Sequence, residues 1–154
     1  AYINSNIEIP YYVVGNHLTR YGDFLKDKYR NKGIIFLGAI FDKLNLDNIR
    51  YFSSLYLHGH SVGGTNPALL EAMAAKTLIL AHNNQFNRSV LDENAFYFCS
   101  TSELTTLLNQ DLQTKKSVFT LNNFRKIEKV YRWPFVIDQY EAYFENILKI
   151  SKKQ

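Results

Sequence analysis

Apolar residues along the chain occur in short runs that alternate with stretches in which they recur every three or four positions. Short apolar runs bounded by glycine or polar residues are typical of buried strands, and the longer period is typical of amphipathic helices. The runs predict strands at residues 11–14, 34–37, 55–57, 77–81 and 95–98. The longer period predicts helices at residues 21–29, 42–53, 66–75, 101–112 and 117–131, and a last one after residue 131.

This order of elements predicts an α/β fold. Strands that alternate with helices form parallel βαβ units, and their right-handed connections give a doubly wound, Rossmann-like sheet. The 154 residues fit one domain. Ligands of such sheets bind beyond the carboxyl ends of the strands. Four segments are therefore expected at one edge of the sheet, namely residues 15–16, 38–39, 58–66 and 82–88.

The composition is compatible with several classes of function and does not identify a single one. Hydrophobic residues make up 46% and charged residues 21%, which is typical of a globular domain. No apolar run approaches the roughly 18 residues that a membrane-spanning helix needs. The single cysteine, Cys99, excludes an internal disulfide and favours a reducing, cytoplasmic location. The net charge of +4 is compatible with nucleotide diphosphates, nucleic acid or an anionic membrane surface.

Residues 58–75, HGHSVGGTNPALLEAMAA, carry the most specific pattern in the chain. A predicted strand leads into two glycines, and a helix then begins with Asn66 as N-cap and Pro67 at its first position. Such a turn leaves backbone N–H groups and the positive end of a helix facing one spot, which suits a phosphate. The same pattern could also be a plain strand-to-helix connection. It matches neither a Walker loop nor the dinucleotide-binding fingerprint.

The motif GGTNPALLEAMAA resembles the donor-binding signature of retaining GT-B glycosyltransferases. With FNRSV soon after it, the stretch HGHSVGGTNPALLEAM is similar to a bacterial subgroup of the glycosyltransferase family 4 type. That subgroup is rhamnosyltransferase-like and builds surface polysaccharides. The resemblance implies a sugar transfer from a nucleotide-sugar, such as a UDP- or dTDP-sugar, to a saccharide or lipid-linked acceptor, without a metal ion or another cofactor.

The resemblance also implies how the chain relates to a whole enzyme. Residues 1–154 would be the C-terminal, donor-binding half, and its first strand–helix unit would be missing. The acceptor site would belong to an N-terminal domain outside these residues, so this half is expected to be inactive alone. The full-length protein would be cytoplasmic, with peripheral association at the inner face of the membrane.

The resemblance assigns roles to individual residues but leaves the catalytic residues unknown. The helix residue Glu71 would accept hydrogen bonds from the ribose hydroxyls. The diphosphate would be bound by Gly63, Gly64, Thr65 and Asn66, and the donor cleft would be bordered by Gly15, Asn16, His58, His60 and Arg88.

The sequence departs from the family at two positions. The wider family carries two glutamates with seven residues between them; Glu71 matches the second, but Gly63 stands in place of the first. Family members often carry Glu directly after FNR, where this chain has Ser89. The first departure supports an alternative, a nucleotide-binding regulatory module without transfer activity. A nucleic-acid-binding domain is disfavoured because the lysines and arginines are scattered along the chain.

Several side chains have simpler interpretations beside the functional ones. His58 and His60 share a strand face, as metal ligands can, but no carboxylate or cysteine stands nearby in sequence to complete a site. The polar residues around Arg88 fit either a solvated loop or contacts with the donor. Trp133 is expected to be a packing anchor at the start of the last helix, and the closing SKKQ is expected to fray.

The missing first strand would lie in the middle of the sheet, between residues 11–14 and residues 55–57. Both neighbours would then expose unpaired backbone groups, which are templates for pairing with another chain. The sequence analysis favours direct pairing of these two strands over a second copy, or the segment 1–7, filling the gap.

Overall fold

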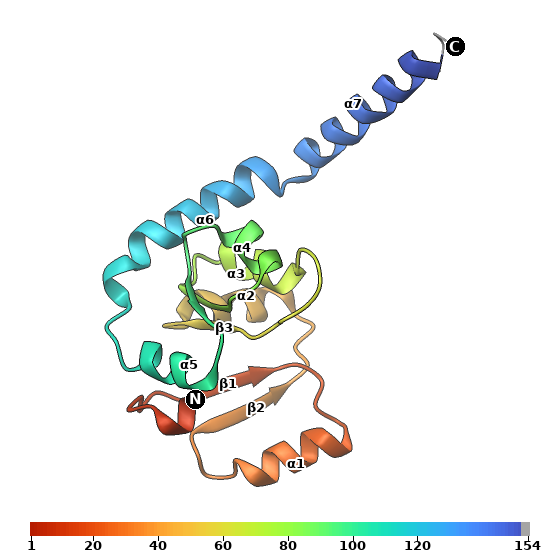
Figure 1. Cartoon of the computed structure of the whole chain (residues 1–154). Coiled ribbons are helices and arrows are strands. Elements are labelled where there is room, and N and C mark those ends of the chain that lie inside the picture. The colour runs from red at the N-terminus through yellow and green to blue at the C-terminus, as the bar shows by residue number, and fades with distance from the viewer. Residues whose placement is uncertain (152–154) are drawn as a thin grey trace.

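A computed structural model of the chain describes residues 1–151, so most of the SKKQ end lies outside the described residues (Figure 1). The first half contains η1 (Tyr2–Asn4), β1 (Tyr11–Val14), α1 (Arg20–Lys28), β2 (Ile34–Gly38), α2 (Lys43–Phe52), β3 (Tyr56–His58) and α3 (Pro67–Ala74). The second half contains β4 (Ile79–His82), α4 (Gln85–Leu91), β5 (Phe96–Phe98), α5 (Thr101–Leu108), η2 (Gln113–Lys115), α6 (Lys116–Val130) and α7 (Trp133–Ser151).

Most of the helices begin where a polar side chain caps the first turn. The side chains of Thr19, Asp42, Asn66, Asn84 and Ser100 each accept a hydrogen bond from a backbone N–H of the following helix. The cap at Asn84 begins α4, a helix that the sequence analysis did not predict. Residues 82–88, expected to be an edge segment or a solvated loop, are therefore the end of a strand and a short helix.

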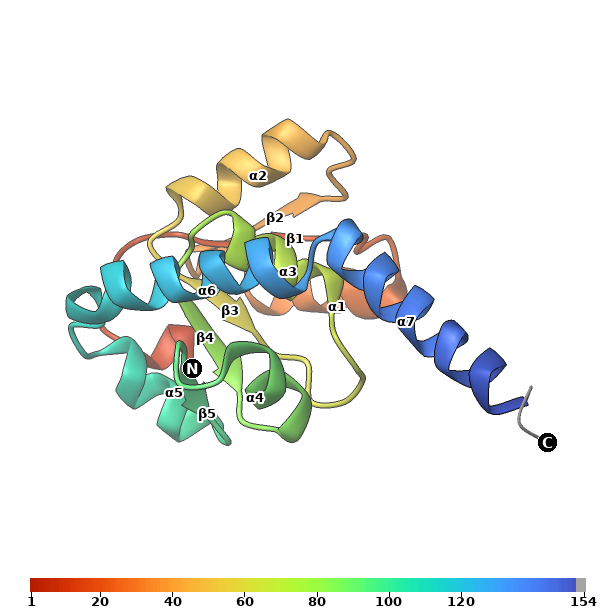
Figure 2. The ribbon, with the colours of Figure 1, turned by 90° about the horizontal axis from the view of Figure 1, so that it is seen from above.

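The core is built on both faces of β4. Its odd-numbered Ile79 and Ala81 pack with buried residues of α3 and α4, and Figure 2 shows α6 lying across α3 on this face. Leu80 of β4, and Leu78 directly before this strand, pack on the opposite side with Leu108 of α5. A strand buried on both faces reads as a continuous apolar run, as residues 77–81 do. The core therefore lies around the β3–β5 half of the molecule.

All described strand pairs are parallel, which confirms the predicted α/β, Rossmann-like class. The strands form two sheets, β1–β2 and β3–β4–β5, and β1 does not pair with β3. The favoured direct pairing of these two strands was therefore wrong. Residues 1–7 do not fill the gap as a strand either, since Tyr2–Asn4 form a 3-10 turn.

The segment before β1 is anchored by hydrogen bonds to distant parts of the chain. The Tyr2 hydroxyl donates to the carbonyls of Ile9 and Gly33, at 2.9 and 3.2 Å. The backbone N–H of Asn6 donates to the Asn109 side chain beyond α5, at 2.8 Å. These bonds tie the entry of β1 to the turn that precedes β2 and to the α5 side of the molecule.

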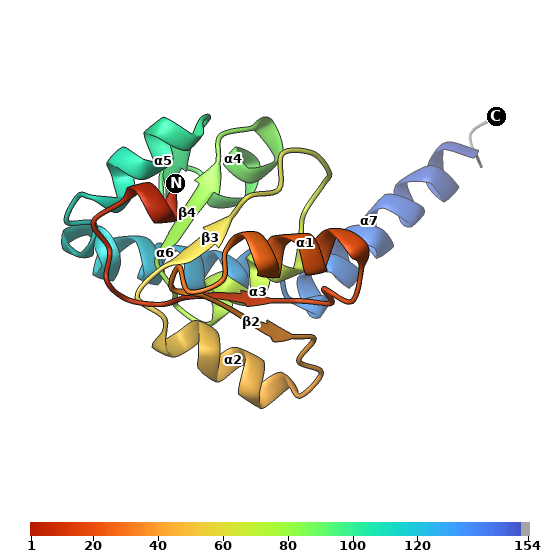
Figure 3. The same ribbon diagram turned by 90° about the horizontal axis from the view of Figure 1, so that it is seen from below.

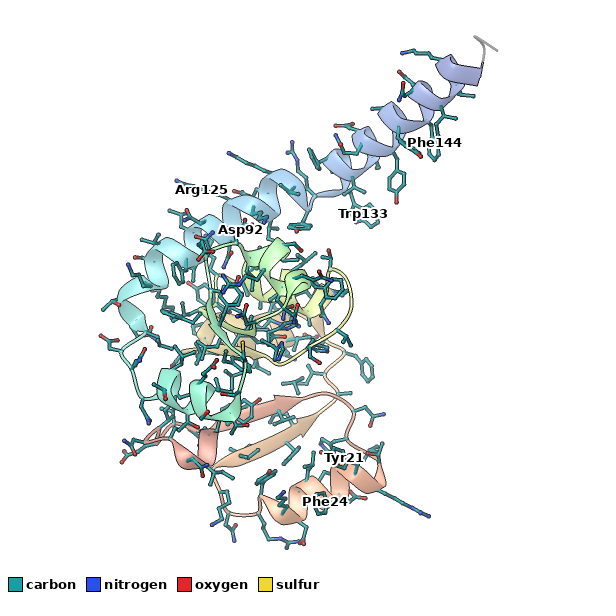
Figure 4. All side chains as sticks on the ribbon, viewed as in Figure 1. Tyr21, Phe24, Asp92, Arg125, Trp133 and Phe144 are labelled. Atoms are coloured by element: carbon teal, nitrogen blue, oxygen red, sulfur yellow. The ribbon has the colours of Figure 1, made fainter. Side chains whose placement is uncertain are left out.

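The last helix departs from the expectation of a packed closing element. Trp133 is 78% exposed, so it is not the packing anchor that the sequence suggested. Figure 1 shows α7 projecting away from the body, and in Figure 4 Trp133 and Phe144 lie on it clear of the core. An amphipathic helix packs only where the fold supplies a surface for its apolar face. None of the described helices combines the length and apolar character needed to cross a bilayer.

Candidate functional site

The carboxyl ends of β1, β2 and β3 open toward one cavity. Gly15, Ala39, Gly59 and His60 line it just beyond their strands, and Ala68 lines it from the first turn of α3. This is the juxtaposition that the parallel topology predicts, because strand carboxyl ends of one orientation meet at one edge. Asn16, next to Gly15, accepts from the Leu18 N–H at 3.0 Å and so supports its own turn.

The turn between β3 and α3 requires a glycine at its centre. Gly63 has φ of 111°, a backbone conformation that side-chain-bearing residues rarely adopt. A glutamate at this position would strain the backbone whatever space surrounds it. The local conformation of this turn therefore favours glycine over glutamate at position 63.

The free donors of this turn lie before the helix rather than in it. Asn66 occupies the first-turn amides: its side chain accepts from the Ala68 N–H at 3.0 Å, and its carbonyl accepts from the N–H groups of Leu69 and Leu70. Within the described chain, the N–H groups of residues 63–66 have no such acceptor. An anion at this turn would be bound by these four amides, with the dipole of α3 behind them.

Glu71 is held by a buried arginine. The Arg50 Nη2 atom lies 2.6 Å from Glu71 Oε2, and its Nη1 lies 3.3 Å from Asp47 Oδ1. Arg50 is only 8% exposed, and its carbonyl also accepts from the buried Thr77 hydroxyl at 2.7 Å. The Glu71 side chain remains 44% exposed. One carboxylate oxygen is thus anchored to α2, and the side chain remains open to solvent.

Sequence reasoning missed Arg50, although a signal was present. Arg50 follows Leu46 by four positions and so falls on the apolar face of the predicted 42–53 helix. A charge on an apolar face is buried only when it is paired. This position was a signal from which a buried ion pair could have been predicted, but only the tertiary structure identifies Glu71 and Asp47 as the partners.

His58 ends β3 in a buried position, beside the more open His60. It is 1% exposed, and its ring centroid lies 4.7 Å from that of His60. Burial first, and the neighbouring His60 second, lower the pKa of His58 from 6.5 to about 4. His58 is therefore neutral at neutral pH. No group of three or more His, Cys, Asp or Glu side chains that could bind a metal occurs among the described residues.

Two asparagines of the α4 segment hold His60 in place. The His60 carbonyl accepts from the side-chain amides of Asn84 and Asn87, each at 3.0 Å. Asn87 also donates to the His82 carbonyl at 2.9 Å, and it is 4% exposed. Asn87 thus joins the ends of two strands at the cavity edge. The sequence analysis saw a polar cluster here but not this bracing role.

Replacing Asn87 with alanine is expected to lower the free energy of unfolding by about 1–3 kcal/mol, because the bonds of its buried amide to the His60 and His82 carbonyls are lost and Asn84 remains the only side-chain donor to His60. Urea unfolding of the two proteins measures the difference. Asn83→Ala is the matched control, since Asn83 is exposed and, among the described residues, its side chain hydrogen-bonds only with the side chains of Arg88 and Cys99. Equal effects of the two substitutions would contradict the bracing role.

Arg88 points its guanidinium toward its own segment. Its Nε donates to Asn83 at 2.8 Å, its Nη1 lies 3.3 Å from Glu93, and its Cζ lies 3.9 Å from the centroid of the Tyr97 ring. In the described chain it makes no hydrogen bond or ion pair with the glycine turn. Its predicted contact with the donor therefore stays a prediction, and would require the side chain to leave these partners.

Comparison with known proteins gives structural matches only. No family model matches the sequence, and no curated protein matches it significantly. The fold is similar to that of Alr3699/HepE from Anabaena, solved in complex with UDP-glucose, with a TM-score of 0.76 at 15% identity. The same protein in complex with UDP matches with a TM-score of 0.77 at 16% identity. A third structure, with UDP and glucose, matches with a TM-score of 0.75 at 15% identity.

The match is extensive for this chain but partial for the other protein. It covers 94% of this chain and 43% of the UDP-glucose and UDP complexes, and 42% of the third. The chain therefore spans less than half the length of these structures. At such low identity the likeness shows the fold alone.

Proposed function

We propose that the chain is the donor-binding half of a glycosyltransferase that takes its sugar from a nucleotide-sugar. The observation that carries the proposal is the turn 63–66, whose four amides have no acceptor among the described residues and directly precede the capped start of α3. The likeness to a fold solved with UDP-glucose supports it. The sequence resemblance extends it to a rhamnosyl- or hexosyltransferase of surface polysaccharide synthesis.

The turn suits the chemistry of such a transfer. Negative charge develops on the leaving diphosphate as the glycosidic bond breaks, and preorganised amide donors stabilise that charge. In this proposal Gly63, Gly64, Thr65 and Asn66 bind the diphosphate, and Glu71 accepts from the ribose hydroxyls. The base and sugar lie near the other cleft residues, Gly15, Asn16, His58, His60 and Arg88. No metal ion is required.

The rest of the enzyme belongs to the same proposal. The acceptor domain is an N-terminal segment of a longer polypeptide, and residues 1–154 alone do not transfer sugar. The longer protein works in the cytoplasm, at the inner face of the membrane. The exposed apolar face of α7, which includes Trp133 and Phe144, is suited to pack against that further domain.

UDP is expected to raise the thermal unfolding temperature of this chain. A ligand at ten times its dissociation constant adds about 1.4 kcal/mol to the free energy of unfolding. Differential scanning fluorimetry with UDP, dTDP and UDP-glucose measures the shift, and uracil without a diphosphate is the ligand control. Gly64→Pro, which removes one amide donor of the turn, should weaken the response to UDP.

The outcomes separate the proposal from its alternative. A shift by UDP, together with sugar transfer by the longer protein, supports the glycosyltransferase. The same shift without sugar transfer by the longer protein favours the alternative, a regulatory nucleotide-binding module. This alternative is supported by Gly63, which stands in place of the first glutamate. If nucleotide diphosphates raise the unfolding temperature of neither this chain nor the longer protein, donor binding is refuted.

A further inference from the structure

The ion pair of Arg50 and Glu71 joins two neighbouring helices, one of which begins at the glycine turn. Arg50 belongs to α2 and Glu71 to α3, and these helices lie side by side (Figure 3). The distance of 2.6 Å between Arg50 Nη2 and Glu71 Oε2 is that of a short, charge-assisted hydrogen bond. The carboxylate of Glu71 is therefore held from α2 and not from its own helix.

The two partners of this pair are unequally exposed. The Arg50 side chain is 9% exposed, whereas the Glu71 side chain is 44% exposed. Among the described residues, Arg50 alone donates a hydrogen bond to the Glu71 carboxylate, and it does so to Oε2. The pair thus fixes one carboxylate oxygen and leaves the other, Oε1, available to a ligand.

Arg50 is itself fixed by the residues around it. Its Nη1 lies 3.3 Å from Asp47 Oδ1. Its carbonyl accepts from the hydroxyls of Ser53 and Thr77, each at 2.7 Å, and Thr77 is buried. A guanidinium presents its N–H groups in a rigid fork, so a fixed arginine holds a carboxylate in one orientation.

Glu71 lies further along α3 than the turn that would bind the diphosphate. It follows the N-cap Asn66 by five positions, which places it about 7.5 Å along the helix axis from that cap. In a nucleoside diphosphate the ribose likewise follows the diphosphate. In the proposed function the free oxygen of Glu71 therefore lies where the ribose hydroxyls would be.

We propose that Arg50 is a positioning residue for the ribose of the donor. It holds Oε2 of Glu71, so that Oε1 accepts from the ribose hydroxyls without first having to be ordered. A nucleoside diphosphate that carries these hydroxyls then binds more tightly than one that lacks them, and this preference depends on the guanidinium. The inference rests on the proposed function, in which Glu71 contacts the ribose.

A purely structural role of Arg50 predicts a different loss. If the pair only joined α2 to α3, removing the guanidinium would lower the stability of the fold and would not change the choice between ligands. A positioned side chain, in contrast, increases the affinity for the ligand that it contacts, because its conformational freedom is lost before binding. The choice between ligands therefore separates the two roles.

The test measures ribose discrimination, which is the dissociation constant of 2′,3′-dideoxyuridine diphosphate divided by that of UDP. Calorimetric titration of the longer protein that contains this chain gives both constants. The wild-type ratio should be about 10 to 150, the equivalent of one hydrogen bond to a charged group. Arg50→Met should lower the ratio by about tenfold or more, by weakening UDP and not the analogue. Arg50→Lys should retain part of it, because an ammonium can hold one carboxylate but lacks the fork.

Thr77→Val is the matched control for stability. It removes the hydroxyl that donates to the Arg50 carbonyl and leaves the guanidinium in place. It should lower the unfolding temperature and leave the ribose discrimination unchanged. Arg50→Met should still fold, because the Asp47 and Glu71 side chains are 36% and 44% exposed and can be solvated. Circular dichroism checks the folding of each variant.

Two further readouts test whether Arg50 acts through Glu71. In steady-state assays Arg50→Met should raise KM for the nucleotide-sugar and change kcat less, whereas a partly unfolded enzyme would lower kcat and keep KM. In the Glu71→Gln background, Arg50→Met should cause no further loss of ribose discrimination.

Several results would overturn the proposal. One is wild-type discrimination in both Arg50 variants, and another is an equal loss in Thr77→Val. A further loss in the double variant would assign Arg50 a direct contact with the ligand instead. Nucleotide binding by wild type is a separate result: equal affinity for UDP and the analogue rejects the ribose site alone, and binding of neither rejects the proposed function.

Discussion

Glu71→Gln is expected to lower the catalytic efficiency of the longer enzyme toward its donor by about 10- to 150-fold. A hydrogen bond to a charged group contributes about 1.5–3 kcal/mol, and the substitution removes the charge that the ribose hydroxyls would contact. Folding should change less, because the amide oxygen of Gln can still accept from Arg50. The measurements are kcat/KM for the donor and the urea midpoint.

The structure provides a matched control for this prediction. Asp47 is the other carboxylate on Arg50, at 3.3 Å, so Asp47→Asn also removes one negative charge beside the arginine. If Glu71 acts only by neutralising Arg50, the two variants should lose donor efficiency equally. A 2′,3′-dideoxynucleoside diphosphate, which lacks the ribose hydroxyls, tests direct contact with Glu71. The wild-type protein should bind this analogue more weakly than it binds UDP. The Glu71→Gln variant should bind the analogue and UDP with about equal affinity.

Acid is expected to destabilise the protein through His58, by about 3 kcal/mol between pH 6.5 and pH 4. The folded state lowers the pKa of His58 to about 4, whereas the unfolded chain keeps the ordinary 6.5. The unfolded state thus binds more protons in this window. The contribution is fully present above pH 6.5 and is lost as the pH falls through the folded-state pKa.

The variant His58→Phe isolates this contribution. The ring is buried and its two nitrogens have no partner among the described residues, so a phenyl ring should cost little stability at pH 7. Urea unfolding from pH 7 to pH 4 should show about 3 kcal/mol less acid loss in His58→Phe than in wild type. His60→Gln should keep most of the loss, because burial is the larger cause of the shift. Parallel pH profiles for wild type and His58→Phe would refute the assignment.

Local chemistry along the sequence was enough to predict most elements. The start of α3 follows from Asn66 and Pro67, which act within one turn of the chain. The strands 11–14 and 34–37 follow from short apolar runs, and the structure has β1 and β2 there. The helix α4 was missed because its cap, Asn84, lies in a run of polar residues that is equally typical of a loop.

The candidate site also has features that depend on neighbouring residues and features that depend on distant ones. The glycine turn and its position before a capped helix were readable from the sequence, because both depend on neighbouring residues. The partners of Glu71 and the bracing of His60 were not, because Arg50 and Asn87 are 21 and 27 residues away from the groups they contact. Residue patterns report periodicity and local hydrogen bonding, whereas such pairs are fixed by how whole elements pack.

Local residue patterns were sufficient to predict an α/β chain and a glycine turn before the capped start of α3. How the strands pair depends on contacts between distant parts of the chain. A strand edge pairs with whatever the rest of the fold brings within hydrogen-bonding reach, and in this fold β1 and β3 belong to separate sheets. The exposure of Trp133 has the same physical reason. The sequence shows an apolar helix face, but a helix packs only against an opposing surface, and most of the apolar face of α7 has none among the described residues.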